Sequence, residues 1–184
     1  RVLVLSASSK TAIGFAQCAR SRGGIEVIGV TSPGNLDFVR ALGIYDKLVA
    51  YDDIATLPTG PAIVSIDMSG NGDVLALVHA HFGDQLRHSM AIGRSHHESP
   101  PAAKQMPGPR PAFFFAPTQV KKRRQDWGPN EYQRRIASAL HAFVDSSHAW
   151  LTVTRVNGPE AAEATWRVVH GGRVPPDVGY IVSV

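Results

Sequence analysis

The stretch that decides the fold is residues 1–17, RVLVLSASSKTAIGFAQ. It opens with a short run of apolar β-formers, VLVL, which stops at four small residues. A helical pattern begins near Lys10, with Ile13, Ala16 and Ala19 on one side. Strand, tight turn and helix in this order are typical of the start of a β-α-β unit, where the backbone N–H groups of the first helical turn can bind a diphosphate.

Small residues occupy the three positions of this turn where a dinucleotide-binding fingerprint usually has glycine. The pattern Ser6-x-x-Ser9-x-x-Ala12 has a spacing similar to that of the fingerprint, with small residues in place of the glycines. Serine resists the left-handed backbone conformation that glycine adopts readily, but its hydroxyl can donate to a phosphate oxygen. Serine is also a good helix cap, so a purely structural turn is the alternative interpretation.

Size and composition predict one globular domain. The chain has 184 residues, of which 43% are hydrophobic and 18% charged. No apolar run reaches the roughly 20 residues that span a bilayer, so we expect no membrane insertion. The single cysteine, Cys18, favours a reducing, cytoplasmic compartment, and we expect it to be a buried, inert thiol of the first helix. Because the chain starts directly on a strand, we interpret it as part of a longer protein.

The polar clusters do not predict nucleic-acid or metal binding. The net charge is +4, and much of the excess lies in residues 121–124 (KKRR), near Trp127. One short basic run is less than a nucleic-acid-binding face needs, so we expect a solvated or cofactor-phosphate-facing role. His96, His97 and Glu98 have no third ligand at a recognisable spacing, so we predict no metal.

Buried strands alternate with amphipathic helices along the chain. This alternation predicts an α/β fold, a Rossmann-type doubly wound parallel sheet of about six strands with helices on both faces. After the first, strands are expected at residues 25–30, 47–51, 62–67, within 88–95 and at 112–116, with helices from 33 to 43 and 71 to 82 and a loop at 96–111. A long helix over 131–150 is expected to cover the sheet edge or one face, followed by a strand at 151–156, a helix at 159–170 and a strand at 180–184.

Two ends of the chain together resemble one known family. Residues 2–20, VLVLSASSKTAIGFAQCAR, resemble without gaps the cofactor-binding turn of zinc-free medium-chain dehydrogenase/reductases such as quinone oxidoreductases. The tail from Leu151 through PEAAEATWRVVHGGRV to YIVSV is similar to the segment that closes the same domain. Between them, GVTSPGNLDFVRALG and VAYDD resemble the second strand, second helix and third strand of that family.

The resemblance is closest to an uncharacterised branch, the domain of unknown function 2855 family, in the motifs SASSKTA, DMSGN, HFGD and FFFAP. It implies that residues 1–184 form an NAD(P)-binding domain. It also implies that the amino-terminal GroES-like domain of the superfamily, which contributes much of the substrate cleft, is absent from this chain. The branch brings no assigned reaction with it.

The end of the second strand predicts the choice of cofactor. An acidic residue there would bind the adenosine ribose hydroxyls and favour NAD. Here the residues are Thr31 and Ser32, without a carboxylate, so a 2′-phosphate is not repelled and NADP(H) is expected over NAD(H). Tyr51 stands where the resemblance places a phosphate-side tyrosine, whereas Arg40 lies more than a helical turn further on.

The carboxyl ends of the later strands are expected to border the nicotinamide half of the cleft. Asp67 there is expected to cap the following helix, with orientation of a hydroxyl as the alternative. Arg94 is expected to bind a phosphate or a substrate acid, or else to be solvated. No catalytic residue is assigned. The candidate cofactor-binding residues are Ser6, Ser8, Ser9, Lys10, Thr11, Thr31, Ser32, Tyr51, Met68, Ser69, Gly70, Gly93, Arg94 and Phe115.

Three functions fit these residues. The first is the NADP(H)-binding portion of a zinc-independent oxidoreductase that transfers a hydride to a small-molecule enone, quinone or carbonyl substrate. The second is a catalytically silent binding or scaffold module, suggested by the loss of the turn glycines. The third is a methyltransferase-like site for a nucleoside cofactor. In addition, residues 180–184 are expected to form an exposed edge strand that could pair in a homodimer.

Overall fold

A computed structural model describes residues 1–93, 105–172 and 174–184. The chain divides into two compact units, residues 1–137 and residues 138–184. None of the helices in these described ranges has the length and apolar character needed to cross a membrane.

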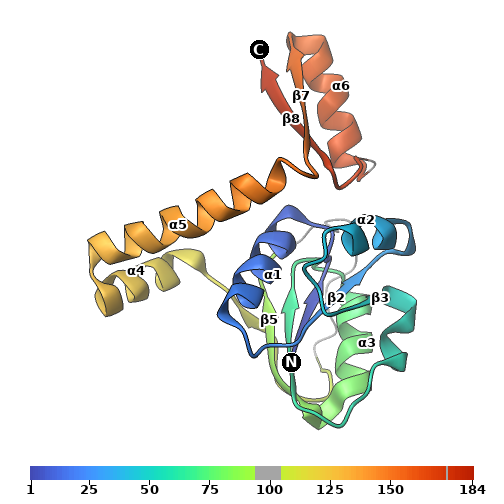
Figure 1. Cartoon of the computed structure of the whole chain (residues 1–184). Helices are drawn as coiled ribbons and strands as arrows, with labels where there is room; N and C mark the ends of the chain where they lie inside the picture. The colour runs from blue at the N-terminus through green and yellow to red at the C-terminus, as the bar shows by residue number, and fades with distance from the viewer. Residues whose placement is uncertain (94–104, 173) are drawn as a thin grey trace. The chain divides into compact units, whose positions relative to one another are not determined.

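The first unit is built on one six-stranded parallel sheet (Figure 1). The strand order is β3-β2-β1-β4-β5-β6, so the chain starts in the middle, runs to one edge and then returns to fill the other side. This confirms the predicted Rossmann-type sheet of six strands. The strands are β1 (Val2–Leu5), β2 (Val27–Thr31), β3 (Lys47–Ala50), β4 (Ile63–Asp67), β5 (Leu86–Ala91) and β6 (Ala112–Phe113).

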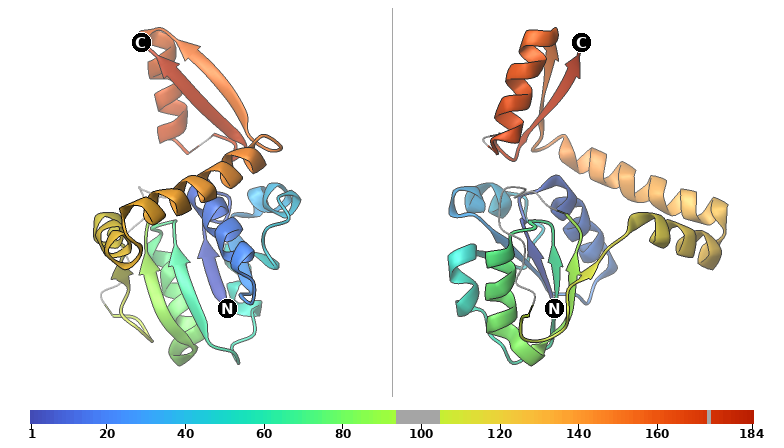
Figure 2. Two further views of the ribbon diagram at one scale, coloured as in Figure 1. Left: turned by 60° about the vertical axis from the view of Figure 1, so that its left-hand side comes forward. Right: turned by 180° about the vertical axis from the view of Figure 1, so that it is seen from behind.

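Helices cover both faces of this sheet, as predicted (Figure 2). Helices α1 (Lys10–Arg22) and α2 (Leu36–Ala41) lie on one face, and α3 (Gly72–Phe82) lies on the other. The expected helix over residues 33–43 is a 3-10 turn, η1 (Pro33–Asn35), followed by α2. Two further 3-10 turns, η2 (Tyr51–Thr56) and η3 (Gly83–Gln85), follow β3 and α3.

The core consists of two apolar clusters, one on each face of the sheet. Successive side chains of a strand point to opposite faces, so β1 contributes Leu3 and Leu5 to one cluster and Val4 to the other. All three are fully buried. Burial of such a side chain contributes about 1.5–3 kcal/mol, and this strand therefore anchors both layers. The predicted apolar side of α1 (Ile13, Ala16, Ala19) is buried as expected.

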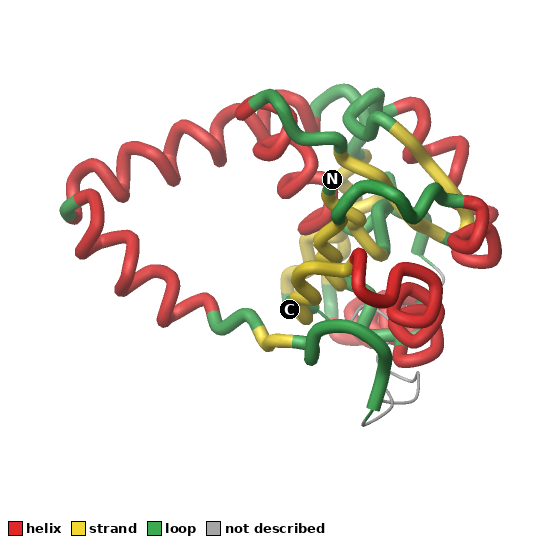
Figure 3. Tube along the Cα trace, turned by 90° about the horizontal axis from the view of Figure 1, so that it is seen from below, coloured by secondary structure: helices red, strands yellow, loops and turns green. Residues whose placement is uncertain are grey.

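The chain after β5 differs from the expectation. The sixth strand ends at Phe113 rather than at residue 116, and an unpredicted helix, α4 (Ala116–Trp127), follows it. Pro117 lies in the first turn of α4, where its missing N–H costs nothing, and Gly128 ends the helix with φ 78°. Helix α5 (Pro129–Ser147) begins directly afterwards (Figure 3).

The long helix was expected to cover the sheet. Helix α5 begins at Pro129, two residues before the predicted range of 131–150, and ends at Ser147, three residues before the end of that range. Ile136, on its apolar side and within the first unit, is 48% exposed. This part of α5 therefore does not form the predicted cover, because a helix packed on a sheet buries such a side chain.

The second unit contains its own small sheet. Strands β7 (Thr152–Asn157) and β8 (Val178–Ser183) pair in parallel, and α6 (Pro159–His170) connects them. The tail was expected to close the domain of the large sheet, but β7 and β8 form a separate two-stranded sheet (Figure 1). In the described part of this unit, Ser147 is the one buried residue. The apolar side chains of the unit are therefore at least partly exposed.

Candidate functional site

The predicted site lies at the carboxyl ends of the parallel strands, which share one edge of the sheet. Backbone hydrogen bonds continue past the strand ends and join them: Ala7 N–H donates to the Val30 carbonyl at 2.9 Å, and Ile92 N–H donates to the Asp67 carbonyl at 2.9 Å. The strand order reverses at β1, between β2 and β4. In open α/β sheets, ligands bind at this reversal point.

Ser6 adopts the left-handed backbone conformation that glycine reaches more easily than other residues. Its φ is 59°, and it is the one non-glycine residue in the described chain with positive φ. Such a conformation costs a serine of the order of 1 kcal/mol and persists where the surroundings enforce it. The Tyr51 side chain is hydrogen-bonded to Ser6. Burial raises the pKa of Tyr51 to about 12, and the hydrogen bond to Ser6 partly opposes this rise.

Ser9 caps the helix that starts at this turn. Its hydroxyl oxygen accepts from the N–H of Ala12 at 3.3 Å, and its backbone is extended, as an N-cap requires. Lys10 and Thr11 follow in the first turn and are exposed. The N–H groups of a first helical turn point out of the helix end, so this surface offers donors and the positive end of the helix dipole.

Tyr45 supports the turn between β1 and α1 through a hydrogen bond, a role that the sequence did not predict. Its hydroxyl donates to the carbonyl of Ala7 at 2.9 Å, and burial raises its pKa above the ordinary value. A Cβ on Gly29 would lie 2.7 Å from the Leu48 side chain and 2.9 Å from the Tyr45 ring, so only glycine leaves room for this packing. A glycine inside an otherwise β-branched strand was the available signal for this close approach.

Ser8 joins the turn to the end of β2. Its hydroxyl oxygen accepts from the Thr31 hydroxyl at 3.2 Å and from the Asn35 side-chain amide at 3.1 Å. Thr31 is 1% exposed, so its side chain serves this bridge. Ser32 is only partly buried and makes no side-chain capping bond at η1. Of the two hydroxyls predicted to meet a 2′-phosphate, Ser32 is the more accessible.

Asp67 organises the turn after β4. Its carboxylate accepts from the Ser69 N–H at 2.7 Å, the Ser69 hydroxyl at 2.6 Å and the Gly70 N–H at 3.1 Å. The expectation that Asp67 caps the next helix is wrong, because Asn71 caps α3 by accepting from its first N–H groups. Asp67 and Ser69 are both buried, so this turn is held rigidly beside β1.

The end of β5 approaches the end of β4 closely. A Cβ on Gly93 would lie 3.0 Å from the Met68 carbonyl oxygen, so a larger residue would push the two strand ends apart. Gly93 is exposed, whereas Met68 packs into the core. Phe115 is 56% exposed and is the N-cap residue of α4. The predicted Arg94 lies outside the described residues.

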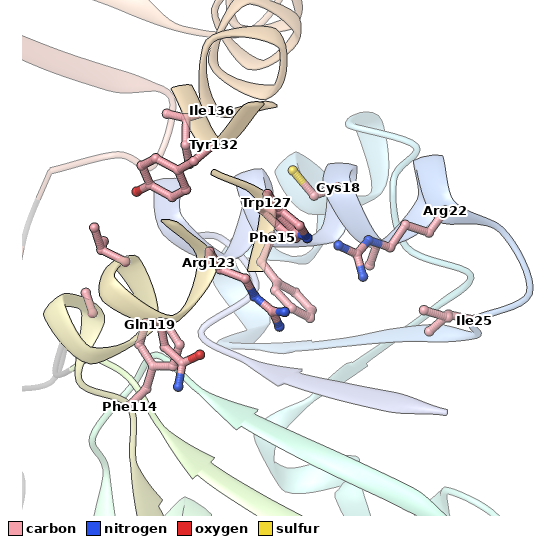
Figure 4. A pocket seen from close by; sticks show the side chains of 13 residues that line it. Phe15, Cys18, Arg22, Ile25, Phe114, Gln119, Arg123, Trp127, Tyr132 and Ile136 are labelled. Carbon is pink, nitrogen blue, oxygen red and sulfur yellow. The ribbon is translucent and has the colours of Figure 1, made fainter. Parts of the chain in front are cut away.

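A groove separate from the strand ends lies beside α1. It has a volume of about 640 Å³ and is lined by α1 together with α4 and the start of α5, all within the first unit (Figure 4). The Trp127 ring in its wall is covered by two guanidinium groups, with Arg135 at 4.3 Å and Arg123 at 5.2 Å from the ring centroid. The prediction that Cys18 is buried is wrong, because it is exposed and lines this groove.

The positive charges of the basic run, residues 121–124, are partly neutralised by a neighbouring carboxylate. On α4, Asp126 forms ion pairs with Lys122 at 2.8 Å and Arg123 at 3.1 Å, and its hydrogen bond with Lys122 lowers its pKa. Across the described ranges, no group of three or more possible metal-ligating side chains comes together. The sequence 96–98 (HHE) lies outside the described residues.

A family model described as a protein of unknown function, DUF2855, matches residues 1–175. The chain belongs to the DUF2855 family. This confirms the closest resemblance of the sequence. No curated protein matches the chain.

Solved structures share the fold of this DUF2855 protein at low sequence identity. The yhdH oxidoreductase of Salmonella enterica, in complex with NADP, is 17% identical with a TM-score of 0.58 over all of this chain and 54% of that one. Bacillus subtilis yhfP with NAD bound is 15% identical, with a TM-score of 0.60 and the same coverage. The CurK enoyl reductase is 18% identical, with a TM-score of 0.57, again over 100% and 54% of the two chains.

The DUF2855 chain therefore spans about half the length of these solved structures. Its fold resembles theirs over the whole of this chain. At these identities the likeness concerns the fold, so the ligand must be argued from this chain's own strand ends.

Proposed function

We propose that this protein binds NADP(H), in preference to NAD(H), at the carboxyl ends of β1, β2 and β4, as the cofactor-binding portion of a zinc-independent oxidoreductase. The observation that carries the proposal is the left-handed Ser6. A left-handed serine is costly, and this one lies at the reversal point of the sheet, where ligands bind in such folds.

The diphosphate would lie on the first turn of α1. The N–H groups there, with the exposed Lys10 and Thr11, supply donors and positive charge to an anion. Ser9 would act from the helix cap, and Ser6 and Ser8 would shape the turn from inside, since both are nearly buried. The turn after β4 (Met68, Ser69, Gly70) and Gly93 would border the nicotinamide half.

The preference for NADP(H) rests on the end of β2. No carboxylate stands at Thr31, Ser32 or Pro33, so nothing there repels a 2′-phosphate. Ser32 is partly exposed and can donate to it, and Tyr51 directly follows β3, the strand that pairs with β2. The solved structures of this fold include one with NADP and one with NAD, so this choice depends on the residues of the present chain.

The substrate class we propose is a small-molecule enone, quinone or carbonyl compound. The bound cofactor would supply the hydride, so no nucleophilic side chain is required of this domain. An enoyl reductase is among the proteins that share the fold, which supports an activated alkene as one substrate. We propose a cytoplasmic setting and no metal in the reaction.

Calorimetric titration of the chain with NADPH and with NADH tests the proposal directly. We expect saturable binding of both, with the tighter binding for NADPH. Absence of saturable binding of either nucleotide would remove the proposal. Tighter binding of NADH would retain the module but reject the stated preference.

A substitution at the end of β2 tests the preference. Ser32→Glu places a carboxylate where it can accept hydrogen bonds from the ribose hydroxyls of NAD(H) and repel a 2′-phosphate. We expect NADPH affinity to fall about tenfold or more, which corresponds to about 1.4 kcal/mol, while NADH affinity holds or rises. Thr59→Glu, in an exposed loop of the same unit, is the matched control and should change neither.

A silent binding or scaffold module remains the second candidate function. The observation that favours it is that the hydroxyls of Ser6 and Ser8 are already hydrogen-bonded within the protein. If this candidate is correct, neither NADPH nor NADH shows saturable binding to the wild-type chain or to Ser32→Glu.

A further inference from the structure

Asp67 is a buried carboxylate with one oxygen that the protein leaves without a hydrogen bond. The residue is 2% exposed. All three hydrogen bonds that its side chain accepts, from the Ser69 N–H, the Ser69 hydroxyl and the Gly70 N–H, end on Oδ1. Among the described residues, none donates to Oδ2. A carboxylate oxygen removed from bulk water without a partner costs free energy, so its retention calls for an explanation.

Other buried polar side chains of the same unit do not share this feature. Both ring nitrogens of His79, for example, are hydrogen-bonded. In the described chain, the side-chain atoms that are completely enclosed and have no partner are Arg1 Nε and Ser65 Oγ. Oδ2 of Asp67 is not one of them, so it keeps a small accessible surface. A ligand can therefore reach Oδ2, whereas it cannot reach Ser65 Oγ.

The turn after β4 sets the direction in which Oδ2 points. Ser69 is fully buried, and its hydroxyl donates to Oδ1 at 2.6 Å and accepts from the Asn71 N–H at 3.1 Å. This ties the Asp67 carboxylate to the residue that caps α3. A planar group held through one oxygen by three donors does not turn freely. Oδ2 is therefore a preorganised acceptor, which loses little entropy when a donor arrives.

Asp67 lies at the reversal point of the sheet. It ends β4 and pairs in register with Leu5, the last residue of β1. Burial raises the pKa of Tyr51 to about 12, and the nearby charge of Asp67 adds a smaller part to this rise. Strand β4 is the first strand on the nicotinamide side of the reversal point in the proposed binding mode.

The chemistry of Oδ2 restricts the group that it binds. A carboxylate oxygen accepts hydrogen bonds, so its partner must be a donor, and a phosphate is excluded because like charges repel. An exposed fraction of 2% leaves access for one small group and not for a strand or helix of another segment. The small donors on the nicotinamide side of a dinucleotide include the two ribose hydroxyls.

We propose that Oδ2 of Asp67 accepts a hydrogen bond from a hydroxyl of the nicotinamide ribose of bound NADP(H). This inference rests on the proposed function, since it requires the cofactor at the strand ends. The bond fixes the ribose and thereby the position of the nicotinamide ring. Hydrogen bonds to a charged acceptor are roughly twice as strong as neutral ones, so Asp67 contributes about tenfold to the affinity.

The first test compares two ligands on one variant. Asp67→Asn keeps an oxygen for the donors of Ser69 and Gly70 and replaces Oδ2 by an amide NH2 group. By calorimetry, we expect Asp67→Asn to bind NADPH about tenfold more weakly than the wild-type chain does. Adenosine 2′,5′-bisphosphate lacks the nicotinamide ribose, so its affinity should stay equal or rise, because a negative charge is removed. An equal loss for both ligands would overturn the proposal.

The second test changes the ligand and so does not depend on how a variant folds. NADPH analogues that lack the 2′- or the 3′-hydroxyl of the nicotinamide ribose are titrated into the wild-type chain. We expect one of the two to bind about tenfold more weakly than NADPH, and this difference to vanish largely in Asp67→Asn. Full affinity of both analogues for the wild-type chain contradicts the proposal, as do losses that add independently to that of Asp67→Asn.

Ser65→Ala is the matched control. Ser65 lies two residues before Asp67, on the same face of β4, and its enclosed hydroxyl is out of reach of a ligand. NADPH affinity should not change in this variant, and a loss equal to that of Asp67→Asn would assign both effects to the core. If the wild-type chain binds neither NADPH nor adenosine 2′,5′-bisphosphate, the proposed function fails as well. Binding of both without any effect of the ribose hydroxyls rejects this inference alone.

Discussion

Individual residues around the first turn show why a serine can replace a glycine there. Ser6 is held at positive φ by a hydrogen bond with Tyr51, while Tyr45 holds the next carbonyl, that of Ala7. Two tyrosines thus enforce a backbone path that glycine would adopt unaided. Neither contact is local in sequence, so the left-handed serine could not be predicted from the turn alone.

Tyr51→Phe is expected to change how stability depends on pH. Burial raises the pKa of Tyr51 from 10.0 to about 12, so the folded state keeps the phenol proton to higher pH than the unfolded state does. The resulting stability is fully present below pH 10 and is lost as the pH rises through 12. The Phe variant should therefore show a shallower decline in the free energy of unfolding over this range.

Denaturant unfolding of both proteins from pH 8 to the alkaline limit of folding measures this difference. At neutral pH, we also expect Tyr51→Phe to lose about 1 kcal/mol, because its hydrogen bond to Ser6 is removed. Parallel pH curves for the two proteins would show that Tyr51 is not protected from ionisation by the fold. The buried Tyr45 is present in both proteins and cancels in the comparison.

At the scale of elements, helix α1 combines a structural and a binding role at one residue. Ser9 satisfies the Ala12 N–H, and the same helix end is the proposed diphosphate site. A bulky residue at this position would confuse the two roles, because it removes the cap as well as the space. The structure supplies a cleaner substitution, since aspartate caps helices about as well as serine.

Ser9→Asp is expected to preserve stability and abolish nucleotide binding. Aspartate retains an acceptor for the Ala12 N–H and suits the positive helix end, but its charge repels a diphosphate. Ser9→Ala should instead lower the free energy of unfolding by about 1 kcal/mol and weaken binding less. Thermal melts and NADPH titrations of both variants check this, and retained binding in Ser9→Asp would place the diphosphate elsewhere.

At the scale of the whole molecule, the two units differ in how much apolar surface they bury. In the described part of the first unit, strands such as β1 and β4 carry fully buried side chains. In the described part of the second unit, Ser147 is the one buried residue. Resistance to local opening follows buried apolar contact, so the units should differ in amide protection.

Hydrogen exchange measured by mass spectrometry should therefore show slow exchange in β1 and β4 and faster exchange in β7 and β8. Protection of β7 and β8 equal to that of β1 at low concentration would contradict this account of the second unit.

The sequence by itself determined the six-stranded parallel sheet and its order of strands and helices. Periodicity in segments such as residues 2–5 and 71–82 is local, and burial of the apolar positions then leaves few ways to assemble them. Periodicity did not predict the helix at residues 116–127, because the charged run there leaves few apolar positions. This helix has Pro117 in its first turn and ends at Gly128. Pro117 near the start and Gly128 after the end were the sequence signals that could have predicted this helix.

Only the tertiary structure decided how the candidate site is supported and where the tail belongs. Tyr45, Tyr51 and Asn35 act on the first turn from 27 to 45 residues away along the chain, a separation that no local pattern encodes. Likewise, the strand pattern of the tail is the same whether it extends the large sheet or forms its own. Strand partners are chosen by hydrogen bonds and packing between distant segments, and a strand's sequence records its periodicity but not its neighbour.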